Sequence, residues 1–262
     1  SNSILLMSQS SFSDDAILIY AKRDIDRVSI PSNVKILGCN SFSYCTLLES
    51  VTFAIDPCET CSIEEINNEA FDSCLKLQSI IIPSSVRLIK ENAFHNCSKL
   101  KAVQFEGNHT SCLTTIGVSA FQACQELEHI SIPPSVEIIE LKAFFQCIKL
   151  KSVVFEQNQD NFRSLKRIGD YAFSECSALN TICIPSTLEN LGIGSFSRCK
   201  ELKWVKFSYG IKYLKEIPEL AFNTCMKLKK ITIPQCVSTI NAKAFQNSGL
   251  QYVHFMTDTL GN

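Results

Sequence analysis

The feature that most constrains the fold of this 262-residue chain is a repeated pattern of phenylalanine, cysteine and leucine. The pattern Ala-Phe-x-x-Cys-x-x-Leu spans Ala70 to Leu77 and recurs from Ala93 to Leu100. Nine phenylalanines share one position in successive copies: Phe42, Phe71, Phe94, Phe121, Phe144, Phe173, Phe196, Phe222 and Phe245. A period of 20–29 residues is typical of leucine-rich repeats. Because one such repeat cannot bury its own apolar edge, the repeats must stack into a solenoid.

Each repeat has the same internal order. An apolar residue, such as Ile66, lies four positions before the alanine, and the phenylalanine, cysteine and leucine follow at helical spacing. A short strand with alternating apolar positions, such as Ile130 and Ile132, comes next. The sequence therefore predicts an α/β solenoid, a right-handed leucine-rich-repeat coil of about nine repeats with one short parallel strand per repeat.

The ends of the chain depart from the repeat. Residues 1–30 lack the Phe-x-x-Cys pattern, and Ser248 replaces the cysteine of the last copy. Because solenoids need atypical terminal units, we expect an N-terminal cap or strand over 1–30. A single solenoid domain then spans 31–255, and a C-terminal tail spans 256–262.

The segment from Ile82 to Val103 reads Ile-Pro-x-Ser-Val-x-x-Ile-x-x-x-Ala-Phe-x-x-Cys-x-x-Leu-x-x-Val. It resembles the BspA-like, Treponema pallidum-type leucine-rich repeat, and the resemblance covers about residues 27–255. It implies a surface or secreted protein of a bacterium or parasitic protist that adheres to host cells, matrix proteins or other cells. It implies no catalytic motif. The alternative is an intracellular scaffold or regulatory module of the same fold.

The cysteines fall into two groups. Eight occupy the repeat position, three residues after a phenylalanine, where a small buried hydrophobic residue is expected. Among the other six, Cys58, Cys61 and Cys112 lie on long insertions, as does His109. These thiols are free or form one disulfide, and a Cys-x-x-Cys with His-x-x-Cys zinc set is the weaker alternative, so we predict no metal. Asn108 begins an Asn-x-Thr glycosylation sequence.

Several function classes find no support in the sequence. The four histidines lie in separate repeats, and no phosphate-binding or nucleophile motif is present. We therefore predict a non-enzymatic protein without a cofactor. The net charge of −1 argues against nucleic-acid binding. No run of 18 apolar residues is present, so no membrane span is expected. The oligomeric state stays open.

The strand positions that point outward form the candidate binding surface, on the predicted concave face. Aromatic and basic residues gather there toward the C-terminus, and one histidine lies further back: Trp204, Lys206, Lys230, Tyr252, His254 and His129. Residues 1–130 carry 9 Lys and Arg against 15 Asp and Glu, a net −6, whereas 131–262 carry 16 against 11, a net +5. The charge count predicts an acidic protein or an acidic glycan as the partner, and the resemblance implies that a protein partner belongs to a host or matrix surface.

Overall fold

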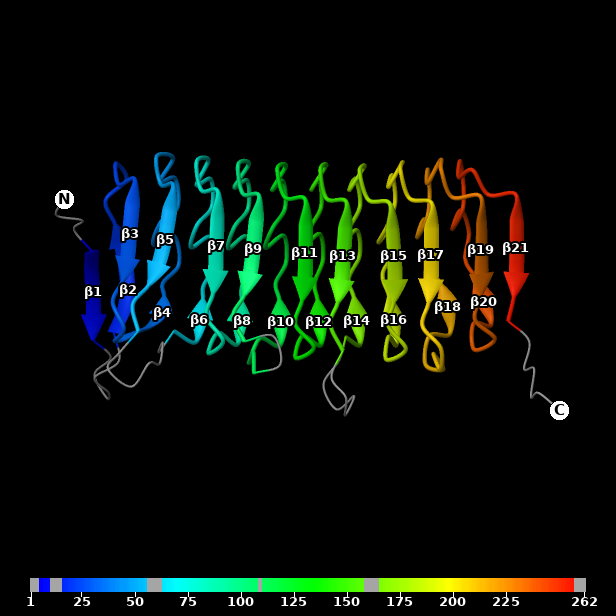
Figure 1. Ribbon diagram of the computed structural model, residues 1–262, viewed down its shortest axis with the longest axis horizontal. Coiled ribbons are helices and arrows are strands. Elements are labelled where there is room, and N and C mark those ends of the chain that lie inside the picture. The colour runs from blue at the N-terminus through cyan, green and yellow to red at the C-terminus, as the bar shows by residue number, and fades with distance from the viewer. Residues whose placement is uncertain (1–4, 10–15, 56–62, 108–109, 158–164, 257–262) are drawn as a thin grey trace.

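The computed structural model describes residues 5–9, 16–55, 63–107, 110–157 and 165–256. The chain winds into coils that stack along one long axis, and the two termini lie at opposite ends of the stack (Figure 1). Each coil contributes strands to two separate stacks, which are joined by turns on both sides.

The first stack consists of four-residue strands, one per coil. Within the described chain these are β3 (Arg27–Ile30), β5 (Ser50–Phe53), β7 (Ser79–Ile82), β9 (Ala102–Phe105), β11 (His129–Ile132), β13 (Ser152–Phe155), β15 (Thr181–Ile184), β17 (Trp204–Phe207), β19 (Lys230–Ile233) and β21 (Tyr252–Phe255). An eight-stranded parallel sheet runs from β3 to β17, and β19 pairs with β21 in parallel. Because each of these ten strands comes from its own coil, the solenoid has about ten turns.

The second stack consists mostly of two-residue strands. It contains β4 (Val34–Leu37), β6 (Glu65–Ile66), β8 (Leu88–Ile89), β10 (Thr115–Ile116), β12 (Ile138–Ile139), β14 (Arg167–Ile168), β16 (Asn190–Leu191), β18 (Glu216–Ile217) and β20 (Thr239–Ile240). β2 (Ala16–Ala21) joins it in parallel beside β4, and β1 (Leu5–Gln9) pairs antiparallel with β2. The prediction of one strand per repeat is therefore wrong, because the apolar residue before each alanine lies in a second strand.

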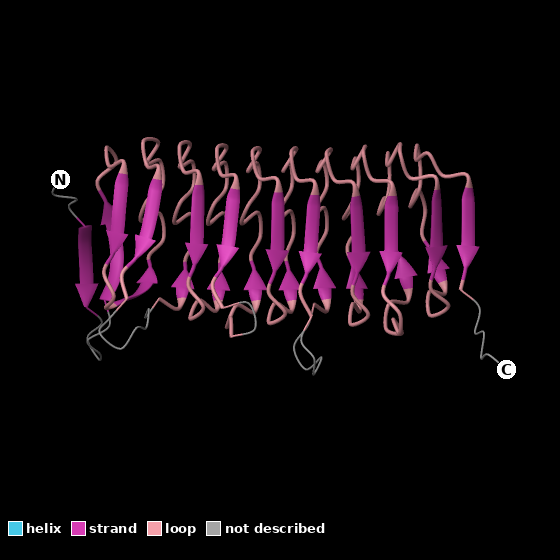
Figure 2. Cartoon of the chain, in the orientation of Figure 1, coloured by secondary structure: helices cyan, strands magenta, loops and turns pink. Residues whose placement is uncertain are grey.

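The α/β assignment is also wrong: the described residues form strands, turns and loops but no helix (Figure 2). The stacking of parallel strands is confirmed, whereas the handedness of the coil stays a prediction. The segment expected to be a helical turn is a chain of tight turns. In the repeat around Phe121, Ser119 and Ala123 have φ angles of 51° and 59°. These left-handed residues on either side of the phenylalanine interrupt any helix.

Alternate backbone amides of these turns donate to the next coil, and the amides between them donate locally, as from Gln122 to the Ser119 carbonyl at 3.0 Å. The Phe121 amide donates to the Ala143 carbonyl at 2.7 Å, and the Ala123 amide donates to the Phe145 carbonyl at 2.8 Å. Since the amide groups find acceptors in the next coil, the turns need no i to i−4 bonds. Because these amides donate to the next coil rather than to a carbonyl four residues earlier, the apolar residues form no helix although their spacing would suit one.

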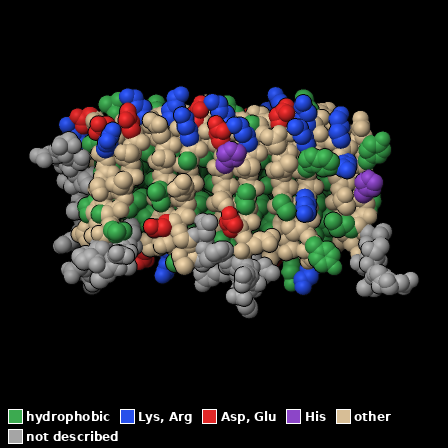
Figure 3. Space-filling view, viewed as in Figure 1, with side chains coloured by type: hydrophobic (Ala, Val, Ile, Leu, Met, Phe, Trp, Pro, Cys, Tyr) green, Lys and Arg blue, Asp and Glu red, His purple; other side chains and the backbone are tan. Residues whose placement is uncertain are grey.

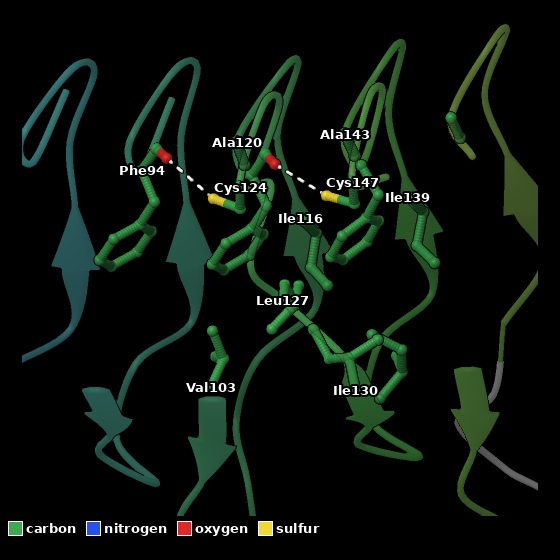
Figure 4. Packing of buried hydrophobic residues seen from close by; sticks show 14 of the residues in the cluster. Phe94, Val103, Ile116, Ala120, Cys124, Leu127, Ile130, Ile139, Ala143 and Cys147 are labelled. Carbon is green, nitrogen blue, oxygen red and sulfur yellow. Dashed lines mark hydrogen bonds between the residues drawn. The ribbon is translucent and has the colours of Figure 1, made fainter. Parts of the chain in front are cut away.

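The core is a column of phenylalanines with a parallel column of cysteines. Phe42 through Phe245 stack with ring centroids 5.0 to 5.7 Å apart and interplanar angles of 1° to 8°. Cys124 donates its thiol proton to the Phe94 carbonyl at 3.3 Å, and Cys147 donates to the Phe121 carbonyl at 3.2 Å (Figure 4). All eight repeat cysteines are buried, which confirms their predicted structural role.

The ends of the two stacks differ. In the second stack, β1 pairs with the free edge of β2 at the N-terminal end. In the first stack, the outermost described strands β3 and β21 each pair with a strand on one side only. β3 (27–30) already pairs with β5 as part of the large sheet. The domain boundaries expected at residues 30 and 255 stay predictions.

Candidate interaction surface

The exposed side of the four-residue strands is the candidate interaction surface, and we call it the strand face. Alternate residues of each strand point into the core and out to solvent, as in β17, where Trp204 and Lys206 are exposed and Val205 and Phe207 are buried. The alternation follows from the pleat of a strand, whose successive side chains point to opposite sides. Ten such strands place two columns of outward residues along the stack.

Five of the predicted site residues lie close together at the C-terminal end of the strand face. This C-terminal patch consists of Trp204, Lys206, Lys230, Tyr252 and His254, and all five side chains are exposed. They come from β17, β19 and β21, which follow one another along the stack. In Figure 3 this end of the molecule carries basic and apolar side chains near one another.

Trp204, Lys230 and Tyr252 form one column of the patch. The Lys230 ammonium lies 4.8 Å from the centroid of the Trp204 ring, a cation–π contact. Tyr252 is opposite Lys230 in the pairing of β19 with β21. Trp204 and Tyr252 are 51% and 63% exposed. Two flat aromatic groups and a cation are therefore presented to solvent in a row, the composition from which interaction hot spots are built.

Lys206 and His254 belong to the second column of the patch. Lys206 is opposite Cys183 in the pairing of β15 with β17, and His254 is opposite Thr232. The Cys183 thiol is exposed and lies 3.4 Å from the Ser208 hydroxyl. This second column adds a cation and an imidazole beside the aromatic column.

Three of the lysines around the patch lack a carboxylate neighbour among the described residues, whereas Lys227 lies 3.8 Å from Glu201. Lys149 pairs with Glu126 at 2.8 Å in an earlier coil, where charges of opposite sign alternate. Near the patch, by contrast, the ammonium groups of three lysines have no carboxylate within 4.0 Å among the described residues: Lys203, Lys206 and Lys229. Uncompensated charge of one sign raises the local potential and attracts an oppositely charged partner.

The structure does not bring His129 into the patch. His129 begins β11, and both β13 and β15 separate that strand from β17. Its Nδ1 lies 2.7 Å from the Ser152 hydroxyl, so the ring is engaged with a neighbour on the same face. His129 is exposed on the strand face as predicted, but it is remote from the other five residues.

Two further predicted sites fall largely outside the described residues. Cys58 and Cys61 lie there, as do Asn108 and His109, so the structure tests neither the thiol loop nor the glycosylation site. Cys112 is described, is partly buried and has a free thiol. In the described part of the chain, no three His, Cys, Asp or Glu side chains are grouped so as to hold a metal ion.

The structure adds two features that sequence reasoning missed. His95 Nδ1 lies 2.7 Å from Asp72 Oδ1, which joins two neighbouring turns. A cavity of about 230 Å³ on the strand face is lined by Phe53, Ile55 and Ile81, with Glu106 at its margin. The contact between His95 and Asp72 could be found from the sequence by comparing the residues that directly follow the repeated phenylalanines. The cavity depends on side-chain packing, which the spacing of residues in the sequence does not reveal.

The described chain also has no helix that is long and apolar enough to cross a lipid bilayer.

Stacked coils with buried phenylalanine and an exposed strand face define a leucine-rich-repeat solenoid. The family model described as a BspA type leucine rich repeat region (6 copies) matches residues 18–151 and 160–261. The chain therefore belongs to the BspA-type leucine-rich-repeat family, which confirms the resemblance found in the sequence. Repeats of this kind are protein-interaction modules.

Two solved structures of similar proteins come from bacteria. A leucine rich cell surface protein of Faecalibacterium prausnitzii is 19% identical, over 99% of this chain and 96% of that one, with a TM-score of 0.45. The T. pallidum leucine rich repeat protein is 21% identical, over 96% of this chain and 82% of that one, with a TM-score of 0.49. No curated protein sequence matches the chain.

Proposed function

We propose that the chain is a non-enzymatic binding protein of the cell surface or of the secreted fraction, an adhesin that engages host cells, matrix or other cells. Its family consists of interaction repeats. The observation that carries the proposal is the C-terminal patch, where Lys230 lies over Trp204, and where Lys206 and the nearby Lys203 and Lys229 have no carboxylate within 4.0 Å among the described residues. The partner is a protein with an acidic surface, and an acidic glycan shares the same charge chemistry.

The aromatic column supplies the short-range part of this interaction. Buried Trp and Tyr side chains dominate the binding energy of many interfaces. Trp204→Ala should therefore weaken binding to a purified acidic matrix protein at least tenfold, measured by surface plasmon resonance. Tyr209→Ala is the matched control, because Tyr209 is fully exposed and lies outside the patch. Equal losses in the two variants, or no loss in either, would contradict the proposal.

The lysines supply the long-range part. Charge pairs at the rim of an interface act mainly on the association rate and are screened by salt. Replacing Lys203, Lys206 and Lys229 by Gln should slow association several-fold at low salt and much less at high salt. Heparin as the analyte in place of the matrix protein separates the glycan from the protein partner. An association rate that salt does not change would reject an acidic partner of either kind.

A second candidate, the intracellular scaffold, is favoured by the free thiols. Each of the twelve cysteines in the described ranges is free, and cytosolic conditions keep thiols reduced. Counting thiols under denaturing, non-reducing conditions separates the two: 14 free thiols favour the intracellular protein, and a disulfide involving Cys58, Cys61 or Cys112 favours secretion.

A further inference from the structure

The second stack of strands is interrupted between β16 and β18. Its nine-stranded sheet ends at β16, and β18 pairs only with β20 among the described strands. In an earlier coil the Lys90 amide, which directly follows β8, donates to the Ile66 carbonyl at 2.9 Å. The residue that directly follows β18 is Pro218, which has no N–H to donate to the Leu191 carbonyl. The proline therefore removes one bond of the ladder where the sheet ends.

A second bond is missing at the same step. The Glu189 amide donates to the Lys166 carbonyl at 2.9 Å, and the Ser238 amide donates to the Lys215 carbonyl at 2.8 Å. Between these two coil pairs, the Lys215 amide makes no such bond to the Glu189 carbonyl within the described chain. Backbone groups that other coils use to pair with each other can therefore bond to a ligand here.

A cleft of about 530 Å³ lies at this interruption. Leu191 and Leu214 line it and are only 6% and 1% exposed, so they form its apolar base. Polar and aromatic residues from both coils line the rest of the cleft: Glu189, Asn190, Tyr213, Lys215 and Glu216. The volume falls within the range of about 300–1,000 Å³ that is typical of small-molecule sites.

The two coils are too close together for a further strand to enter between them. The Gly194 amide donates to the Glu219 carbonyl at 2.9 Å, which joins the turns of the two coils directly. The ring centroids of Phe196 and Phe222 are 5.7 Å apart. An inserted strand would need two strand spacings, about 9.5 Å. The cleft therefore suits a small molecule rather than an extended peptide.

Tyr213 gives the cleft an aromatic surface. The side chain is 52% exposed, and the Lys212 ammonium lies 5.1 Å from the centroid of its ring. A single cation covers one face of a ring, so the other face can contact a ligand. Aromatic faces pack well against flat apolar surfaces, and the C–H face of a pyranose ring is such a surface.

The charges around the cleft cancel. Glu189 and Glu216 line it together with Lys215, and Lys212 lies beside Tyr213. The Glu216 carboxylate accepts a hydrogen bond from the Asn241 side-chain amide at 2.9 Å, which fixes its position. Two carboxylates and two ammonium groups favour neither a cation nor an anion. A neutral ligand with many hydrogen-bonding groups matches such a lining.

We propose that the cleft between β16 and β18 binds a neutral pyranose sugar. The Tyr213 ring packs against the C–H face of the sugar. The sugar hydroxyls, which both donate and accept, bond to the Asn190 side chain, to the Glu189 carbonyl and to the Lys215 amide. The cleft belongs to the second stack, whereas the C-terminal patch belongs to the first, so this inference does not depend on the proposed function.

The test uses saturation-transfer NMR and calorimetry with the full chain and three probes: methyl β-D-glucopyranoside, methyl β-D-galactopyranoside and methyl α-D-mannopyranoside. At least one should bind, with the strongest transfer to its ring C–H protons. Tyr213→Ala should weaken this binding at least tenfold. Tyr252→Ala is the matched control, because Tyr252 is a 63% exposed tyrosine of the C-terminal patch, and it should leave the affinity unchanged. No binding of any probe, or equal losses in the two variants, would overturn the proposal.

Two further measurements test the sugar ring and the interruption. The acyclic hexitol sorbitol has hydroxyls but no ring face, and it should bind at least tenfold more weakly than the bound pyranoside. Pro218→Asn restores an amide at the position where Asn241, one coil later, donates to the Ile217 carbonyl at 2.9 Å. The variant should let β16 and β18 pair, narrow the cleft and weaken sugar binding several-fold. Equal binding of sorbitol, or an unchanged affinity in Pro218→Asn, would contradict the proposed site.

Discussion

At the residue scale, the repeated phenylalanines from Phe42 to Phe222 are the largest fully buried side chains among the described residues. Phe121 is fully buried and contacts Phe94 and Phe144 at centroid distances of 5.1 and 5.3 Å. Removing a ring that is stacked on both sides leaves a cavity that neither neighbour can collapse into, because each is held by the next ring along the column. A phenylalanine at the end of the stack, such as Phe255, is not held between two neighbouring rings. The contribution of a phenylalanine to stability therefore depends on its position along the solenoid.

Phe121→Ala should therefore lower the free energy of unfolding by about 3–5 kcal/mol. Phe255→Ala removes the same side chain from a site that is 64% exposed, and we expect a loss below about 1 kcal/mol. Urea denaturation of the two variants checks the contrast. Similar losses would mean that the phenylalanine column does not stabilise the fold.

At the element scale, the cysteine column makes the stack sensitive to alkali. Burial raises the pKa of Cys147 and of Cys225 to about 12, and it raises the pKa of Cys124, Cys176 and Cys199 as well. Each thiol donates a proton to a carbonyl of the preceding coil, a bond that a thiolate cannot make. The column is thus built from thiols that stay protonated in the folded state.

The sign of the pH dependence follows from these shifts. A thiol whose pKa is higher in the folded than in the unfolded state stabilises the fold fully below the unfolded value of about 8.5. That stability falls as the pH rises toward the folded value of about 12. Cys147 and Cys225 should each lower the free energy of unfolding by about 1.4 kcal/mol per pH unit across this window. Stability measured in urea at pH 8, 9 and 10, under reducing conditions, should fall steeply.

Cys147→Ala provides the control for this effect. The variant loses one titrating thiol, so its pH slope above 9 should be shallower by about 1.4 kcal/mol per pH unit. Alkylation at pH 8 gives a second readout: the exposed Cys39 and Cys183 should react in the native protein, whereas Cys147 should react only after denaturation. Alkylation of Cys147 as fast as Cys183 would contradict burial as the cause.

At the scale of the whole molecule, the solenoid is a linear array in which each coil contacts mainly its two neighbours. Stability in such arrays is approximately a sum of coil and interface contributions. In the first stack, the middle strands pair on both sides, whereas the outermost described strands β3 and β21 each pair on one side. The stack should therefore open from its ends before its middle.

Hydrogen exchange should show this gradient. Backbone amides of β11 and β13 should exchange at least tenfold more slowly than those of β21, because β21 opens by breaking one interface. Uniform protection along the stack would instead indicate that all coils unfold together.

The repeat in the sequence is sufficient to predict the core but not the path of the backbone. Phe71 and Cys74 recur with the period of the solenoid, so their burial follows from stacking alone. The helix expected around them is absent because the same apolar spacing suits two tight turns. A helix would form if an amide such as that of Phe71 bonded locally, and tight turns form because this amide donates to the Ala93 carbonyl in the next coil. The spacing of apolar residues within one repeat does not reveal which acceptor the amide uses.

The candidate site was predictable to a similar extent. Alternation along the strands places Trp204 and Lys206 on the exposed face, as the structure has them. The cation–π contact of Lys230 with Trp204 depends on the register and on side-chain geometry, which the sequence does not contain. The exposure of Phe255 depends on whether a further strand covers the last coil. The remote position of His129 becomes evident once the strands are ordered in space.

The regular stacking of the coils places outward side chains at regular intervals along the strand face. One outward residue per column recurs with every coil, so a ligand that lies along the axis contacts one side chain per column from each coil. Duplicating one internal pair of coils would lengthen the strand face without altering the contacts inside any other coil. It would also move every later outward residue further from the earlier ones. The length of the strand face and the identity of its outward residues can therefore change independently, while the phenylalanine column keeps the distance between coils constant.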